Sequence, residues 1–134
     1  MKLASQIVGA LLGLAFVAFG AMLLLDLGPK PPAPPEGTPV AHFMAAFAPT
    51  GYLKFVKLFE VVGGLLVAFP RTRRAGLLVL GPILINIGAF HGFVTGGEGL
   101  FSPMLVVLVA MTLFLVWVER DAFRRFVWNA PTTN

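Results

Sequence analysis

The hydrophobic positions of this chain fall into four long runs, separated by polar, basic or proline-rich segments. The runs extend over about 4–25, 52–69, 75–93 and 103–118. Each is close to the 17–25 apolar residues that a helix needs to cross the hydrocarbon core of a bilayer. The pattern predicts an all-α fold, an integral membrane four-helix bundle in which residues 1–134 form a single transmembrane domain.

The segment between the first two runs predicts an irregular loop followed by a short helix. Residues 28–39 contain Pro31, Pro32, Pro34 and Pro35, and prolines so close together prevent a helix and favour an extended chain. Residues 40–47 are rich in Phe, Ala and Met. This second piece is too short to cross a bilayer, so we expect a helix at the membrane interface that covers the bundle as a lid.

The composition supports a membrane environment and excludes several kinds of chemistry. Hydrophobic residues make up 57% of the chain and charged residues 12%, which is more apolar surface than a soluble core of this size can bury. The chain has no cysteine, so disulfides, thiolate nucleophiles and iron–sulfur clusters are excluded. Lys2 and a long apolar run without a small-residue cleavage site predict a retained first helix and not a removed signal peptide.

The basic residues predict the orientation of the four spans. With four spans, the N-terminus, the second link and the C-terminus share one side, and that side holds Lys2, Arg71, Arg73, Arg74, Arg120, Arg124 and Arg125. The loops on the opposite side contain one basic residue, Lys30. Because cytoplasmic loops retain Lys and Arg, we expect both termini to be cytoplasmic. The C-terminal arginines are expected to meet anionic lipid headgroups, and nucleic acid is not an expected partner.

Small residues predict where the helices approach each other. Glycine faces let helix backbones pack closely in lipid, where burial of apolar surface brings no gain. One such face is formed on the first run by Gly9, Gly13 and Gly20, and a second on the third run by Gly81, Gly88 and Gly92. Packing within one bundle is favoured over a dimer interface, although a homo-oligomer and protein partner subunits both stay open.

Three charged residues lie inside the second run and need an explanation. A charge at the bilayer centre costs about 3 kcal/mol on insertion scales, so such groups are usually paired or functional. Lys54 is close enough to the outer end for its ammonium to reach water, and an interface anchor is the favoured interpretation. Lys57 and Glu60 are three residues apart, so they share one helix face and are expected to pair directly.

Polar residues at equal depth on the two helices joined by the tight second link predict a polar pocket. The link joins antiparallel helices, which places Glu60 level with Asn86 and Lys54 level with His91. Asp26 and His42 would lie just above them. A pocket that opens toward the outer face and binds a ligand through Lys57, Glu60, Asn86, His91, Lys54 and Asp26 would account for all these groups.

Each of these groups also has a purely structural alternative. The Lys57–Glu60 pair could serve only to set the helix register, and Asn86 could serve only as a hydrogen-bonding contact between helices. His91 points about 140° away from Asn86 around a helix, so the two cannot face one partner squarely. The two histidines are not expected to form a haem site, because only His91 lies within an expected span. Haem, metal and nucleotide are not expected, and no catalytic residues are assigned.

Residues 57–66 (KLFEVVGGLL), 80–82 (LGP), Asn86 and 90–91 (FH) resemble the DoxX-like family of small bacterial membrane proteins. The resemblance covers about residues 4–118. It implies a four-helix bundle in the inner membrane and an association with membrane redox complexes, such as a thiosulfate:quinone oxidoreductase. Glu60, Asn86 and His91 stand where the family's polar positions would stand. The lack of cysteine argues against a thiol-based redox role.

Three functional hypotheses follow. The first is an accessory subunit of a membrane redox system that binds a quinone-like or lipid-like molecule, with quinone as the candidate cofactor. It depends mainly on the resemblance. The second is a small-solute or lipid carrier, and the third is a structural membrane scaffold. An autonomous enzyme is not expected, because the sequence contains no nucleotide loop, catalytic triad or metal-ligand cluster.

Overall fold

The computed structural model describes residues 1–128, and within this range the regular structure is entirely helical. Six α-helices are present: α1 (Lys2–Leu24), α2 (Pro39–Phe47), α3 (Tyr52–Ala68), α4 (Arg73–Ala89), α5 (Pro103–Val118) and α6 (Arg120–Trp128). A short 3-10 helix, η1 (Ala48–Thr50), precedes α3, and a π-helix, η2 (Phe90–Val94), continues α4. The all-α prediction is confirmed for the described part, and residues 129–134 of the expected 1–134 domain lie outside it.

The predicted helix boundaries agree with the structure because local signals set them. Pro103 occupies the first turn of α5, and the Ser102 hydroxyl accepts a hydrogen bond from the Leu105 amide at 3.4 Å. The expected lid is α2, whose N-terminus is capped by the Thr38 hydroxyl in the same way. Sequence analysis did not predict α6, because residues 120–128 look like a charged tail.

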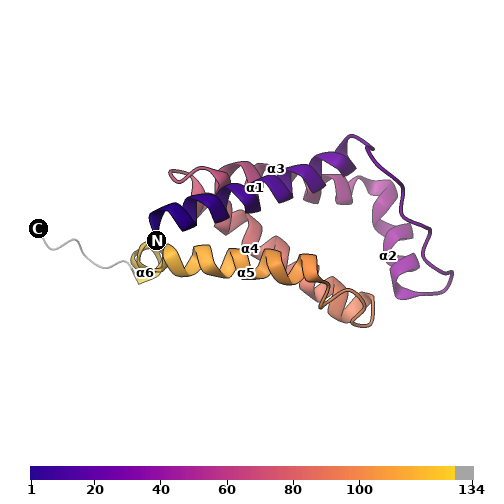
Figure 1. Cartoon of the computed structure of the whole chain (residues 1–134). Coiled ribbons are helices and arrows are strands. Elements are labelled where there is room, and N and C mark those ends of the chain that lie inside the picture. Colours follow the sequence, from indigo (N-terminus) through magenta and orange to yellow (C-terminus); the bar gives the residue numbers. More distant parts are fainter. Residues whose placement is uncertain (129–134) are drawn as a thin grey trace, which may run out of the picture.

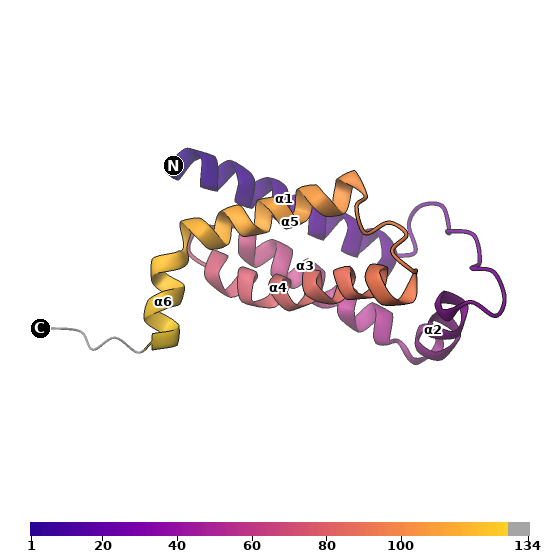
Figure 2. The same cartoon turned by 90° about the horizontal axis from the view of Figure 1, so that it is seen from below.

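The four long helices α1, α3, α4 and α5 lie side by side, and the short helices α2 and α6 lie at opposite ends of them (Figures 1 and 2). Two helical stretches, Lys2–Leu24 and Arg73–Val94, are long and apolar enough to cross a membrane. A third is added if α5 and α6, which are bent by 67° relative to each other, are counted as one broken span. These lengths and compositions indicate a membrane protein.

The interior is small relative to the apolar surface that remains exposed. The buried core consists of Leu12, Phe16, Val67, Leu77, Leu80, Leu84, Leu105 and Leu115. Large apolar side chains such as Leu14, Ile85 and Leu113 point outward from α1, α4 and α5. An exposed apolar surface of this extent is typical of contact with lipid or with another protein.

Helices α1 and α3 pack backbone to backbone through the first predicted glycine face. A Cβ atom on Gly13 would lie 2.5 Å from the carbonyl oxygen of Gly64, and one on Gly64 would lie 2.9 Å from that of Gly13. A Cβ on Gly20 would likewise lie 2.7 Å from the Val61 side chain. Only glycine permits this separation, so the predicted packing role of the first face is confirmed.

The second predicted glycine face is wrong. A Cβ on Gly81, Gly88 or Gly92 would meet no heavy atom within 4 Å. The glycine of α4 that makes close contact is Gly76, which lies against the backbone of Val67 just after the tight link. Spacing along a helix shows that residues share a face, but it does not show whether a neighbouring helix covers that face.

This packing predicts opposite outcomes for two alanine substitutions on α4. Gly76→Ala would push a methyl group into the Val67 backbone, and such overpacking typically costs about 1–3 kcal/mol. Gly81→Ala enters open space and exchanges glycine for a better helix former, a gain of roughly 0.8–1 kcal/mol. Thermal unfolding in one detergent should therefore show a lower Tm for Gly76→Ala and an equal or higher Tm for Gly81→Ala. Equal shifts for both variants would contradict the packing described.

Candidate functional site

A buried ion pair lies in the middle of α3. The Lys57 Nζ atom is 2.8 Å from both carboxylate oxygens of Glu60, Oε1 and Oε2. Glu60 is 3% exposed, whereas the side chain of Lys57 is 27% exposed. The predicted direct pairing of these two residues is confirmed.

The position of the pair follows from the two faces of α3. Its α1 face carries Lys57, whose backbone oxygen would lie 3.2 Å from a Cβ on Gly20. Its α4 face carries Gly63, which packs against Leu80, and Glu60 lies one turn before Gly63. Glu60 is about 12 Å along the helix from its start, at 1.5 Å per residue. The carboxylate is therefore enclosed within the bundle and the ammonium lies at its edge.

The pair leaves one hydrogen-bond donor unused. An ammonium group has three N–H donors, and two of those on Lys57 are directed to Glu60. Within residues 1–128, Lys57 makes no third side-chain hydrogen bond. A partly exposed cationic donor held in place by a buried carboxylate can bind a carbonyl or phosphate oxygen.

Asn86 does not join this pair. Its side chain is exposed on α4, and within the described residues it makes no hydrogen bond, so the expected direct contact with Glu60 is absent. The contact between Gly63 and Leu80 places Glu60 level with Ile83, one turn before Asn86. At 100° per residue, Asn86 also points well away from the contact face that contains Leu80 and Ile83. Similar depth does not bring the two side chains into direct contact, because depth does not determine rotation about the helix axis.

His91 closes a loop instead of facing Lys54. It lies in η2, and its Nδ1 atom is 2.8 Å from the carbonyl oxygen of Glu98. The Thr95 hydroxyl donates to this same oxygen at 2.6 Å. Lys54 is exposed and forms no hydrogen bond with His91 in the described part of the chain. The π-helical turn changes the direction of side chains after Ala89, which helical spacing alone does not predict.

The two remaining groups of the expected pocket are also exposed. Asp26 ends α1 in the left-handed conformation with φ 52°, and the next residue, Leu27, donates its amide to the Met22 oxygen at 2.7 Å. This is the geometry of a Schellman helix end, usually formed by glycine. His42 is exposed on α2. The structure therefore does not gather the six predicted residues into one pocket.

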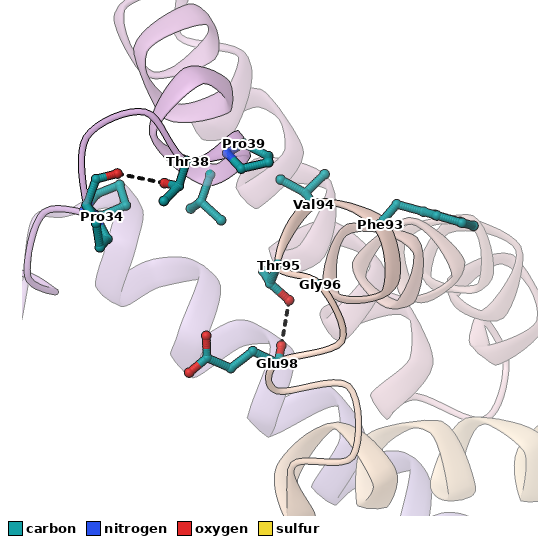
Figure 3. A pocket seen from close by; sticks show the side chains of 10 residues that line it. Pro34, Thr38, Pro39, Phe93, Val94, Thr95, Gly96 and Glu98 are labelled. Atoms are coloured by element: carbon teal, nitrogen blue, oxygen red, sulfur yellow. Dashed lines mark hydrogen bonds between the residues drawn. The ribbon is translucent and has the colours of Figure 1, made fainter.

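Two cavities are found elsewhere. One, of about 510 Å³, lies between the proline-rich loop with α2 and the η2 loop, and Figure 3 shows Pro34, Thr38, Pro39, Phe93, Val94, Thr95, Gly96 and Glu98 around it. The other, of about 410 Å³, is an open apolar groove between α1 and α5, lined by Leu11, Ala15, Phe19, Pro103, Met104, Val107, Leu108 and Met111. None of the six predicted site residues lines either cavity.

Sequence analysis missed the structural role of Arg73, a second buried charge. Arg73 is 3% exposed, and its Nε atom lies 3.5 Å from the Val67 carbonyl oxygen near the C-terminus of α3. Its Nη2 atom is buried without a hydrogen-bond partner in the described residues, in a space that the lack of a side chain at Gly9 leaves open. The negative end of the α3 dipole favours a cation there. In the sequence, nothing distinguishes Arg73 from the other basic residues of the second link.

Within residues 1–128, the fold and the ion pair define a helical protein with two helices, or up to three, that are long and apolar enough to cross a membrane, and with a charged pair within its bundle. Comparison with protein-family models, curated proteins and solved structures gives no significant match to this chain. The resemblance to the DoxX-like family therefore stays a prediction from residues 57–66, 80–82, Asn86 and 90–91.

The ion pair makes a prediction about stability. Lys57→Met leaves the Glu60 carboxylate buried without a partner, and breaking a buried pair in this way typically costs about 3 kcal/mol. The double change Lys57→Met with Glu60→Met removes both charges and should recover much of that loss. Lys54→Met, one turn earlier and exposed, is the matched control and should have little effect. If Lys57→Met and Lys54→Met unfold at the same temperature in detergent, the pair does not stabilise the bundle.

Proposed function

We propose that the chain is a four-span bundle of the bacterial inner membrane with both termini cytoplasmic, as the DoxX-like resemblance implies. Support comes from α1, α3, α4 with η2, and α5, which occupy the four apolar runs. It also comes from the apolar side chains exposed along these helices and from the basic residues gathered on one side. In this arrangement α2 covers the outer end and α6 lies at the cytoplasmic end.

Topology reporters test this arrangement. A reporter fused to either terminus, or placed in the link at residues 70–72, should behave as cytoplasmic, and one inserted at Pro34 should behave as external. The basic bias of the short loops is the physical reason. A cytoplasmic signal from the Pro34 insertion would refute the orientation, whereas opposite signals from the two termini would refute the even number of spans.

Within this bundle, we propose that the protein is an accessory subunit of a membrane redox system and binds an amphipathic, quinone-like or lipid-like molecule through Lys57. The observation that carries the proposal is the unused donor of Lys57, fixed by a buried carboxylate in an apolar bundle. A quinone presents carbonyl oxygens at the end of an apolar tail, and the donor matches such an oxygen.

The roles of the two residues differ. Lys57 would hold the polar end of the ligand and stabilise negative charge that develops on its oxygen, since a charged donor in an apolar site acts more strongly than in water. Glu60 would hold the ammonium in place through its two 2.8 Å contacts. A lysine without this carboxylate would extend toward water, as the exposed Lys54 can.

A lipid carrier is the second candidate, and the apolar groove between α1 and α5 favours it. The groove is lined by apolar side chains, which an acyl chain can contact along its length. Its Met104 and Met111 side chains can adapt to chains of different shape.

Ligand retention separates these proposals. The wild-type protein, gently purified and analysed by native mass spectrometry, should carry quinone, and Lys57→Met should retain on the order of tenfold less, as expected when a charged hydrogen bond is lost. Lys54→Met should retain the wild-type amount. Retained phospholipid in place of quinone would favour the carrier.

A complementation assay tests the structural alternative. Glu60→Gln keeps the shape of the side chain but cannot ionise, so it should fold and yet fail to restore the phenotype of a deletion strain. The double Lys57→Met and Glu60→Met variant should fail as well. Full complementation by a folded double variant would refute a functional role of the pair and leave a scaffold.

A further inference from the structure

Helix α6 is a separate element that turns sharply away from the end of α5. It follows α5 after the single residue Glu119 and is bent from it by 67°, so that it lies across the end of the long helices where the N-terminus is found (Figures 1 and 2). The Arg74 Nε atom contacts the Glu119 Oε2 atom at 2.7 Å. The Arg120 guanidinium lies 4.7 Å from the centre of the Trp117 ring. These contacts hold α6 across the end of the bundle.

The two sides of α6 differ sharply in chemistry. At 100° per residue, Arg120, Asp121, Arg124 and Arg125 lie on one face together with the exposed Trp128, and Ala122, Phe123, Phe126 and Val127 form the other. Phe123 packs against the buried core, so the apolar face is the one turned toward the bundle. Phe126 shares that face but is 74% exposed, because it lies beyond the edge of the neighbouring helices.

We propose that α6 is an in-plane anchor that binds the anionic phospholipid surface of the membrane. Phe126 and Val127 insert between the lipid chains beside the bundle, and Arg124 and Arg125 bind the phosphates of anionic headgroups. The inference depends on the proposed insertion of the bundle in a membrane, but it does not depend on the ligand of Lys57.

Three observations identify lipid as the partner that α6 binds. The helix carries three arginines against one acidic residue, which complements an anionic surface and not a neutral one. Its exposed apolar side chains continue the exposed apolar surface of α5, where Trp117 is also exposed. Tryptophan and arginine together at the end of a spanning helix are typical of the membrane–water interface.

Depth measurements test the anchor, and the lack of native cysteine allows single labels. An environment-sensitive fluorophore on Phe126→Cys, in nanodiscs containing phosphatidylglycerol, should show blue-shifted emission and quenching by brominated lipid. The same label on Asp121→Cys, on the polar face, should show the emission of an aqueous site. Equal, aqueous emission from the two positions would overturn the proposal.

A third label distinguishes failure of the α6 anchor from failure of membrane insertion. Leu113→Cys lies on the exposed surface of α5 and should be quenched by brominated lipid if the bundle spans the membrane. Quenching at Leu113 but not at Phe126 would refute the anchor alone. No quenching at Leu113 would refute the spanning bundle on which the anchor rests.

Lipid preference tests the role of the arginines. In mixed phosphatidylglycerol and phosphatidylcholine, native mass spectrometry of the wild-type protein should show preferential retention of phosphatidylglycerol. The Arg124→Gln, Arg125→Gln pair should reduce this preference on the order of tenfold, and the charge-preserving Arg124→Lys, Arg125→Lys pair should keep most of it. An unchanged preference in the glutamine pair would overturn the assignment to these arginines.

Discussion

The contact between the backbones of α1 and α3 at Gly13 and Gly64 is the constraint on which the rest of the structure depends. Each glycine leaves room for the carbonyl oxygen of the other, so the two helices approach more closely than any side chain would allow. In lipid, where apolar burial between helices brings little gain, such close packing is a main source of association. The contact determines which residues of α3 face α1 and therefore where the two buried charges lie.

Those two charges have different surroundings, and neither is paired with the other. Glu60 is neutralised by Lys57 within a single helix, and Arg73 lies against the C-terminal carbonyls of α3 in the space left by Gly9. Within residues 1–128, the Lys57–Glu60 pair therefore presents one free donor at the edge of an apolar bundle and does not lie in a polar chamber, and the proposal of an amphipathic ligand with one polar end depends on this feature.

Much of the fold is local and could be predicted from the sequence. The four apolar runs form helices. Helix α5 begins at the Ser102 cap and α2 begins after the prolines of the preceding loop, because these signals act within one turn. The Lys57–Glu60 pair was predictable for the same reason, since residues three apart on a helix always share a face. Helix α6 was missed because it is too short for a spanning helix and its apolar residues lie among arginines.

Contacts between helices were decided only by the tertiary structure. Depth from the tight link placed Asn86 near the level of Glu60, but rotation of α4 turned Asn86 outward, and Gly76 instead of Gly81 meets α3. The π-helical turn at η2 directed His91 to its own loop. Hydrophobic periodicity determines the length of a helix and the residues that share its face, whereas rotation against a neighbour depends on the packing of every side chain along the interface. That packing is a property of the assembled bundle.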